Sequence, residues 1–296
     1  MTDVAKLHLV SSNSVVITGS STGIGRACAL RMDALGWTVF AGVRKEKDAE
    51  ALAADASDRL VPLILDVADP DTIHDSSKRV ADATAERGLD GLVNNAGITV
   101  QGPLEYLPLD DLRKQLEVNV TGQIAVTQAF LPAIRKATGR IVFMSSVAGR
   151  TETLPFLGPY GSSKRALEGL AEALRVELLP WKIRVSLIEP GSIATPIWEK
   201  GDETFDDLVG ALPEEGRERY IEAMNRGRVV GRKAGERGIP PDRVADKVEH
   251  ALTSRRPRTR YLVGADAKAQ TYLLQAMPTP LRDRGLGKLL GYDKKK

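Results

Sequence analysis

The sequence predicts an α/β protein, because short apolar runs alternate with stretches of helical periodicity along most of the chain. Two features mark particular strand ends. A glycine-rich turn follows the first apolar run, and Tyr160 and Lys164 open the helix that follows the fifth. The 296 residues suffice for one large α/β domain or two small ones, with a substantial buried core.

Composition and charge exclude several classes of protein. The net charge is only +3, with basic residues spread among acidic ones, so nucleic-acid binding is not expected. No run approaches the roughly 18 apolar residues of a spanning helix, and residues 1–14 lack the apolar stretch of a secretory signal. Cys28 is the only cysteine, which excludes disulfides within the chain and suits a reducing compartment. We therefore expect a soluble, cytoplasmic protein.

The first predicted strand, residues 15–17, leads into a glycine turn and then a helix. The glycines follow the pattern Gly-x-x-x-Gly-x-Gly over residues 19–25. Such a turn lets the backbone approach a pyrophosphate, whose charge is met by free N–H groups at the helix start. A tight corner without a ligand is the alternative. The candidate phosphate-binding residues are Gly19, Ser21, Gly23, Ile24 and Gly25.

The ends of the second and third predicted strands, 37–43 and 60–65, bear on the nucleotide. An acidic residue after the second strand suits a ribose 2′-hydroxyl, whereas an arginine suits a 2′-phosphate. Arg44 stands there, which favours NADP, although a solvated turn arginine is the alternative. Asp66, followed by Val67, is placed either to accept a hydrogen bond from an adenine amino group or to cap the next segment.

Asparagines mark the next two elements. Asn94 and Asn95 end the fourth apolar run and precede Ala96 and Gly97. This suits a backbone that bends close to a ligand, and side-chain bridging between strands is the alternative. Asn119 lies within the next helical pattern. Asparagine is a mediocre residue inside a helix, so we expect Asn119 to hold a water or to distort the helix.

The predicted chemistry centres on Tyr160 and Lys164, which follow a strand at 141–144 and lie four apart at the start of a helix. Residues at this spacing are neighbours. A free tyrosine has a pKa of about 10. A positive charge about 4 Å away, at an effective dielectric near 20, favours the phenolate by roughly 4 kcal/mol and lowers that pKa by about three, before desolvation is subtracted. Tyr160 could then exchange protons near neutral pH. A half-buried tyrosine beside a solvated lysine is the alternative.

The chain after the sixth predicted strand, residues 182–188, is less regular. Pro190 and Gly191 stop this strand and leave backbone groups free near the same pocket edge. Residues 196–240 keep helical spacing only in part, and we expect a lid over a lipophilic substrate. Within it, the glycine- and arginine-rich piece at 226–238 is expected to be a mobile, solvated loop, and an anion-binding site is the alternative.

A further helix and a seventh strand at 261–263 precede the C-terminal tail, residues 265–296. We expect the tail to be a packed or frayed helix. Covering the pocket, joining a subunit interface and touching an acidic membrane surface are the alternatives. His8, His74 and His250 lie among no cysteines or matched carboxylates, so no metal site is predicted.

Together these motifs resemble those of the short-chain dehydrogenase/reductase superfamily. The resemblance extends from Val15 to Gly264. It implies a single doubly wound (Rossmann) domain over residues 1–296, whose seven mostly parallel strands run in the order 3-2-1-4-5-6-7. The matching motifs, in order, are the glycine turn, Asp66, Asn94 to Gly97, Ser146 with Tyr160 and Lys164, and Pro190 to Thr195. The cofactor-binding residues implied by these motifs include Asn94, Ala96, Gly97, Tyr160, Lys164, Pro190, Gly191, Ile193 and Thr195.

The resemblance also implies an active tetrad of Asn119, Ser146, Tyr160 and Lys164. Tyr160 would be the acid/base, and Ser146 would hydrogen-bond the substrate oxygen. Lys164 would bind the nicotinamide ribose and lower the tyrosine pKa, while Asn119 would hold a water in the proton relay. Ser146 is preferred to Ser145 because the family pattern places two small or apolar residues and a glycine after the serine. Hydride would pass directly to or from the nicotinamide, so no metal is required.

Residues 39–42 and 186–191 resemble the branch that contains retinol, 17β-hydroxysteroid and 3-hydroxybutyrate dehydrogenases. The resemblance implies an NAD(P)-dependent oxidoreductase for a secondary alcohol or ketone, with lipophilic, steroid- or retinoid-like compounds among the candidates. NADP is the first choice because of Arg44. NAD is close behind, because several members of that branch use it without an acidic residue after the second strand. We expect a homodimer or homotetramer.

Two other classes of function are left open. One is a dinucleotide-binding sensor or scaffold without turnover, against which the complete tetrad argues. The other is a sugar-nucleotide epimerase or dehydratase, which would usually have a longer C-terminal domain and a different glycine spacing.

Overall fold

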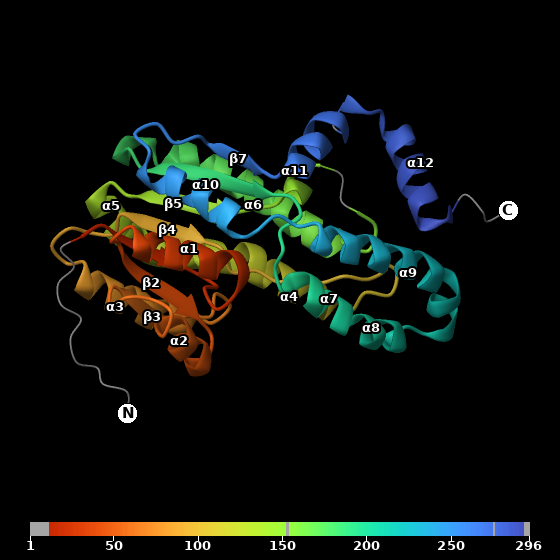
Figure 1. The fold of residues 1–296 in the computed structure, drawn as a ribbon, viewed down its shortest axis with the longest axis horizontal. Helices are drawn as coiled ribbons and strands as arrows, with labels where there is room; N and C mark the ends of the chain where they lie inside the picture. The colour runs from red at the N-terminus through yellow and green to blue at the C-terminus, as the bar shows by residue number, and fades with distance from the viewer. Residues whose placement is uncertain (1–11, 152–153, 275, 293–296) are drawn as a thin grey trace.

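The computed structural model describes residues 12–151, 154–274 and 276–292, and one seven-stranded sheet forms its centre (Figure 1). All neighbouring strands are parallel, in the order β3-β2-β1-β4-β5-β6-β7, which confirms the predicted fold class. The strands are β1 (Ser14–Ile17), β2 (Thr38–Val43), β3 (Leu60–Ile64), β4 (Gly91–Asn94), β5 (Arg140–Met144), β6 (Arg184–Pro190) and β7 (Arg260–Val263).

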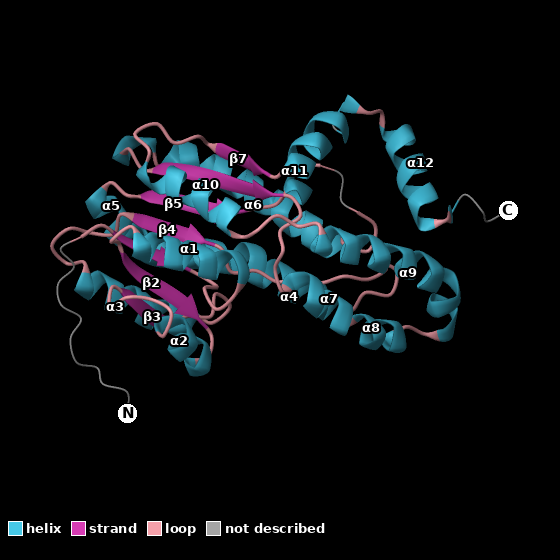
Figure 2. Cartoon of the chain, in the orientation of Figure 1, coloured by secondary structure: helices cyan, strands magenta, loops and turns pink. Residues whose placement is uncertain are grey.

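Helices cover both faces of the sheet, which explains why the strands are continuous apolar runs. Met32 of α1 and Val248 of α10 are buried against one face, and Figure 2 shows these two helices in front of the strands. Phe130 of α5 and Leu167 of α6 are buried on the other face. The first layer comprises α1 (Gly23–Ala34), α2 (Glu46–Ala53) and α10 (Asp242–Thr253), and the second α3 (Pro70–Ala83), α5 (Gly122–Ala137) and α6 (Gly158–Glu177).

The strand order reverses beside β1, and this determines where a ligand can bind. Ile17 at the end of β1 lies opposite Ala41 of β2 on one side and Val93 of β4 on the other. The turns that follow β1 and β4 are therefore neighbours. In open α/β sheets, ligands bind at the carboxyl ends of the strands where the order reverses.

Residues 196–240 fold into three helices at one end of the molecule, α7 (Ile197–Glu203), α8 (Phe205–Ala211) and α9 (Glu214–Glu236). The expected mobile loop at 226–238 is wrong, because α9 continues to Glu236. Interior glycines disfavour a helix, but here they serve packing. A Cβ at Gly235 would lie 2.9 Å from Cγ of Trp198, so this glycine lets α7 lie against α9.

Ion pairs also hold α9 in place. Arg228 in its middle contacts Asp202 of α7 at 2.5 Å and Asp206 of α8 at 3.2 Å. Tyr220 of α9 contacts the rings of Tyr106 and Phe156 edge to face, with centroids 6.1 Å apart in each pair. The apolar side of α8 and α9 therefore faces residues 102–106 and 154–158 of the sheet domain.

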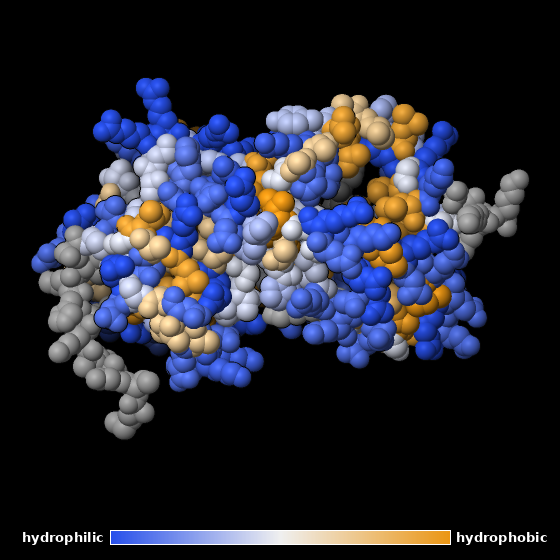
Figure 3. Space-filling view, viewed as in Figure 1, coloured by the Kyte–Doolittle hydropathy of each residue, from blue (hydrophilic) through white to orange (hydrophobic). Residues whose placement is uncertain are grey.

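The tail forms α11 (Ala265–Ala269), a π-helical turn (Gln270–Leu274) and α12 (Thr279–Leu290). The last helix lies against α9 and buries Leu290, so the packed helix expected here is present. Tyr272 and Leu273 are about two-thirds exposed, and Figure 3 shows apolar residues gathered over this part of the surface. Within the described ranges, no helix is long and apolar enough to span a membrane.

Candidate active site

The glycine turn after β1 is compact enough to need glycine at three positions. Gly19 and Gly23 have φ angles of +68° and +57°, which disfavour other residues. A Cβ at Gly25 would lie 2.2 Å from the carbonyl oxygen of Gly19, and one at Gly19 would lie 2.8 Å from Cα of Ala96. The backbone at the start of α1 is thus left bare of side chains, which fits an anion at the helix N-terminus.

Asn95 joins this turn to the end of β4. Its side-chain amide donates to the carbonyls of Thr18 and Gly19 at 2.9 and 3.1 Å, and Thr18 Oγ1 accepts from the N–H groups of Asn95 and Ala96. Asn94 is buried instead and donates to Thr127 at 2.8 Å. Sequence reasoning assigned Asn94 to the cofactor and omitted Asn95. The two side chains point to opposite faces, as successive side chains of a strand do, so that of Asn95 reaches the glycine turn and that of Asn94 the core.

The residues predicted to select the nucleotide lie at the ends of β2 and β3. Arg44 is exposed immediately after β2. The Asp66 carboxylate accepts from the N–H of Ala68 at 3.0 Å, so it serves as a turn cap. The N-cap of α3 itself is Asp69, which accepts from the N–H of Asp71. Arg44 and Asp66 are therefore at the same sheet edge as the glycine turn.

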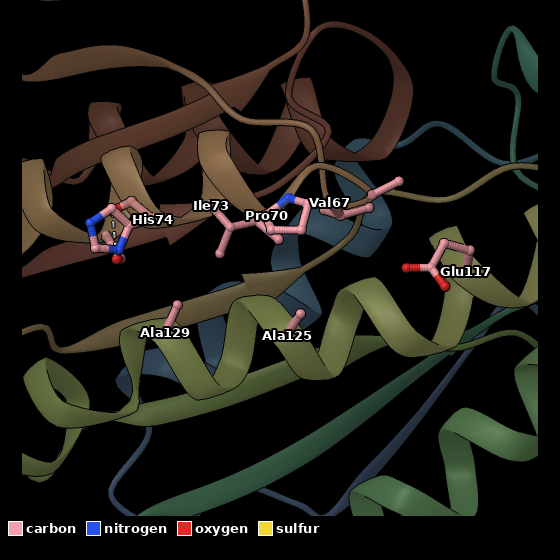
Figure 4. Close-up of a pocket in the computed structure, with 9 residues that line it drawn as sticks. Val67, Pro70, Ile73, His74, Glu117, Ala125 and Ala129 are labelled. Carbon is pink, nitrogen blue, oxygen red and sulfur yellow. Dashed lines mark hydrogen bonds between the residues drawn. The ribbon is translucent and has the colours of Figure 1, made fainter.

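A hollow of about 390 Å³ lies beside Val67, between α3 and α5 (Figure 4). Figure 4 shows Ile73 and His74 of α3 facing Ala125 and Ala129 of α5 across it. None of the four tetrad residues lines this hollow. It is a groove between two helices, distinct from the site around Tyr160.

Ser146 and Tyr160 meet where β5 ends and α6 begins. Their side chains are close enough for the Ser146 hydroxyl to act on the pKa of the Tyr160 phenol. The Ser146 hydroxyl also accepts from the N–H of Ala148 at 3.2 Å, which caps a short 3-10 turn. Ser145 is buried and points elsewhere, because a Cβ at Gly149 would lie 2.8 Å from its Oγ. The geometry thus favours Ser146, as the family pattern did.

Lys164 is buried one helical turn after Tyr160. Its Nζ donates to the Met144 carbonyl at 2.7 Å and lies 5.8 Å from the centre of the Tyr160 ring. Burial raises the pKa of Tyr160, and the nearby Ser146 hydroxyl opposes this. Burial lowers the pKa of Lys164 to about 8, which the charge of Glu168 opposes. The predicted proximity is present, but the pKa of Tyr160 in the protein alone is raised, because helical spacing predicts contact and not desolvation.

Asn119 lies in a π-helical turn (Glu117–Thr121) between α4 (Leu109–Leu116) and α5, so the expected distortion of the helix is present. Its amide nitrogen donates to Ile98 O at 3.0 Å and Ser163 Oγ at 3.1 Å, and its oxygen accepts from Ile98 N at 2.9 Å. Both polar atoms are therefore committed to the fold. The amide nitrogen has no donor left for a water in a proton relay, whereas the oxygen can accept one further hydrogen bond.

Two glutamines that were not predicted as site residues also bond the backbone after β4, as Asn119 does. Gln115 accepts from the N–H of Val100 at 2.6 Å, and Gln123 donates to the carbonyl of Ala96 at 2.6 Å. Both are buried, like Asn119. The signal was present in the sequence, because polar residues at 115, 119 and 123 lie four apart on one helix face.

The segment after β6 completes the edge of the site. Ser192 donates through its N–H to Asp266 at 2.7 Å, and a Cβ at Gly191 would lie 2.4 Å from the same carboxylate. The side chain of Thr195 contacts the position where a Cβ of Gly23 would be, at 3.3 Å. The predicted turn at 190–195 therefore reaches the glycine turn, and Asp266, which was not predicted, anchors it.

The sequence profile of the short chain dehydrogenase family matches residues 13–205. The chain belongs to this family. The match covers every predicted site residue, from Gly19 to Thr195, and the predicted oxidoreductase is confirmed.

Two relatives place this short-chain dehydrogenase within its family. Retinol dehydrogenase 7 of Rattus norvegicus is 38% identical over 283 residues, covering 91% of this chain and 86% of its own. The 17-beta-hydroxysteroid dehydrogenase type 6 of Bos taurus is 38% identical over 275 residues, with the same coverage. The predicted likeness to the retinol and hydroxysteroid dehydrogenase branch is thereby confirmed.

A solved structure shares the fold over nearly the whole length. The short chain dehydrogenase from Burkholderia cenocepacia, crystallised in complex with NADP, superposes with a TM-score of 0.70 at 25% identity. The match covers 94% of this chain and 98% of that one.

Proposed function

We propose that this short-chain dehydrogenase transfers hydride between NADP and the carbon of a secondary alcohol or ketone, with NAD as the second choice of cofactor. The protein is an NAD(P)-dependent oxidoreductase of its family. The observation that carries the proposal is the proximity of the Ser146 and Tyr160 side chains at the sheet edge that also holds the glycine turn.

The residues present fit a nicotinamide dinucleotide. The side-chain-free backbone at Gly19 and Gly25 suits its pyrophosphate, and exposed Arg44 suits a 2′-phosphate. Thr195, packed against Gly23, is placed to contact the same molecule on its other side. When bound, the nicotinamide supplies or accepts the hydride.

The chain's own residues supply the proton and the orientation. Ser146 and Tyr160 present two hydroxyls to one substrate oxygen. In ketone reduction, Tyr160 donates its proton to that oxygen as the carbon receives hydride, which yields the alcohol; in oxidation the proton returns. The raised pKa of Tyr160, caused by burial, keeps the phenol protonated before ligands bind. A protonated phenol is the form required for ketone reduction.

We assign the substrate to the lipophilic class. Two relatives at 38% identity are named for retinol and a hydroxysteroid. An apolar cluster of Phe205, Leu212 and Met224, packed with Tyr106 and Phe156, lies where α8 and α9 meet the sheet domain. In this proposal residues 196–240 act as the substrate lid and 265–296 as a supporting tail of a single domain.

Location and assembly extend the proposal. Cytoplasmic residence remains a prediction, for which the single cysteine suits a reducing compartment. Assembly into a homodimer or homotetramer is supported by apolar side chains exposed along α6 and just after it. These are Leu170, Val176, Leu179 and Trp181.

The test is oxidation of NADPH and NADH, followed by absorbance, with steroid, retinoid and short keto-acid substrates. We expect turnover with at least one lipophilic ketone and a preference for NADPH. Tight dinucleotide binding without turnover across the panel would instead favour a sensor or scaffold. Turnover confined to short keto acids would refute the lipophilic assignment alone.

A further inference from the structure

A cluster of acidic and basic side chains lies next to Lys164, where α6 packs against β6 and β7. Arg260 of β7 pairs with Glu168 and Glu172 of α6 and with Glu189 of β6. Arg150 approaches Glu189 from the loop after β5, at 3.3 Å. Glu168 and Glu189 are buried, whereas Glu172 is 55% exposed. Burying a carboxylate costs free energy unless the group is paired, and even a buried ion pair often adds little to stability. Stability alone therefore does not account for this cluster beside the active site.

Glu168 connects the cluster to the active site. It lies four residues after Lys164 on α6, where side chains are neighbours. Gly149 packs against both, since a Cβ there would be 3.1 Å from Glu168 Cγ and 3.1 Å from the Lys164 carbonyl oxygen. Any side chain at Gly149 would force the two residues and Ser145 apart.

The hydrogen bonds of the two residues complement each other. Glu168 accepts from Arg260 with Oε2, while its buried Oε1 has no hydrogen-bond partner among the described residues. Lys164 donates to the neutral carbonyl of Met144. A buried carboxylate oxygen without a donor and a buried ammonium bonded to a neutral group thus lie on adjacent turns of one helix.

We infer that Glu168 is a positioning residue for the proposed reaction: fixed by Arg260, its carboxylate is the counterion that keeps the Lys164 ammonium charged beside Tyr160. The inference rests on the proposed function. Arg260 has the further task of separating Glu168 from Glu189, whose charges repel each other. The charged and titratable groups around the pair are Tyr160, Glu172, Arg150, Glu189 and Arg260.

The test compares two substitutions of carboxylates that share Arg260. Glu168→Gln removes the buried charge and keeps the shape, and Glu172→Gln removes the exposed one. Titration of Lys164 is followed by NMR of ¹³C-lysine-labelled protein without ligand, with the signal assigned by its loss in Lys164→Arg. We expect Glu168→Gln to lower the pKa of Lys164 by about one, a tenfold change in the protonation equilibrium. Glu172→Gln should leave the titration near that of the wild type.

Kinetics supply the second measurement. In Glu168→Gln, kcat/KM at pH 8 should fall about fivefold and recover towards lower pH, as expected if only the protonation of Lys164 has changed. Should Glu168→Gln not fold, the double variant Glu168→Gln with Arg260→Gln removes both members of the pair and is titrated in its place. An unchanged Lys164 titration in the folded variant overturns the inference. A lowered pKa in a protein without turnover would uphold the electrostatic pairing and refute the proposed function instead.

Discussion

The Lys164 ammonium lies 5.8 Å from the centre of the Tyr160 ring and is hydrogen-bonded to the last carbonyl of β5, that of Met144. This bond ties the start of α6 to the strand end from which Ser146 follows. The hydroxyls of Ser146 and Tyr160 are thereby held together. The reactive groups are positioned by one contact between a strand and a helix, which links catalysis to the packing of the sheet.

Replacing Tyr160 by Phe should leave dinucleotide binding nearly intact and lower kcat by at least about 10²-fold, because the acid/base group is lost. The ring still fills its partly buried site. Binding is measured by NADPH fluorescence and turnover by absorbance. Tyr272→Phe removes a hydroxyl from a residue that is 69% exposed and is the matched control. Wild-type turnover in Tyr160→Phe would remove this residue from the mechanism.

The two adjacent serines should differ sharply. Ser146→Ala removes a hydroxyl that contacts Tyr160 and should lower kcat by about 10²-fold or more. Ser145→Ala removes a buried Oγ that has no hydrogen-bond partner among the described residues, so stability should be unchanged or slightly higher. Steady-state kinetics and urea denaturation of both variants test this pair. Equal losses of kcat would contradict the assignment to Ser146.

Arg44→Asp should shift the preference from NADP towards NAD, because a carboxylate repels a 2′-phosphate and can accept from a 2′-hydroxyl. The ratio of kcat/KM for the two cofactors is the measurement. Lys47→Asp makes the same charge change three residues further on, at another exposed site, and should leave the ratio unaltered. An equal shift in both variants would show a general charge effect and exclude a specific role for Arg44.

Replacing glycine by alanine should have opposite effects on stability at the glycine turn and at an exposed position of a helix. A Cβ at Gly25 would meet Gly19 O at 2.2 Å and Asn95 Nδ2 at 2.4 Å, so Gly25→Ala should cost about 1–3 kcal/mol and weaken NADPH binding. Gly169 is an exposed residue of α6, and a Cβ added to it would have no atom within 4 Å. Gly169→Ala should therefore stabilise by up to about 1 kcal/mol. Chemical denaturation and fluorescence titration measure both, and tight NADPH binding by Gly25→Ala would refute the close fit.

The buried lysine should make stability depend on pH. Burial lowers the pKa of Lys164 from 10.5 to about 8. Between these values the unfolded chain keeps a proton that the folded protein has released, so the contribution of Lys164 to the free energy of unfolding rises with pH across this window. The full change corresponds to about 3 kcal/mol. It is lowest below about pH 8.

Denaturation of the wild type and of Lys164→Met from pH 7 to 10 tests this dependence. The advantage of the methionine variant should shrink as pH rises. Lys45→Met removes an exposed lysine and should give a difference that does not vary with pH. A constant difference for Lys164→Met as well would mean that the lysine is not desolvated.

Some features could not be read from the sequence because they depend on packing between distant segments. The glycines at 227, 231 and 235 suggested a mobile loop, yet Trp198 of another helix packs against α9 at Gly235. Likewise the sequence does not distinguish Asn94 from Asn95. The pleat of β4 places the side chain of Asn94 in the core and that of Asn95 at the glycine turn.

The sequence alone determined the alternating strands and helices, the glycine turn and the pairing of Tyr160 with Lys164, because these follow from local periodicity and from residues a few positions apart. The tertiary structure alone decided the electrostatics of that pair. Burial of the pair, and the approach of Arg260 of β7 to Glu168 of α6, depend on how segments far apart in the chain pack together. Desolvation is a property of the assembled core, and short-range spacing carries no information about it.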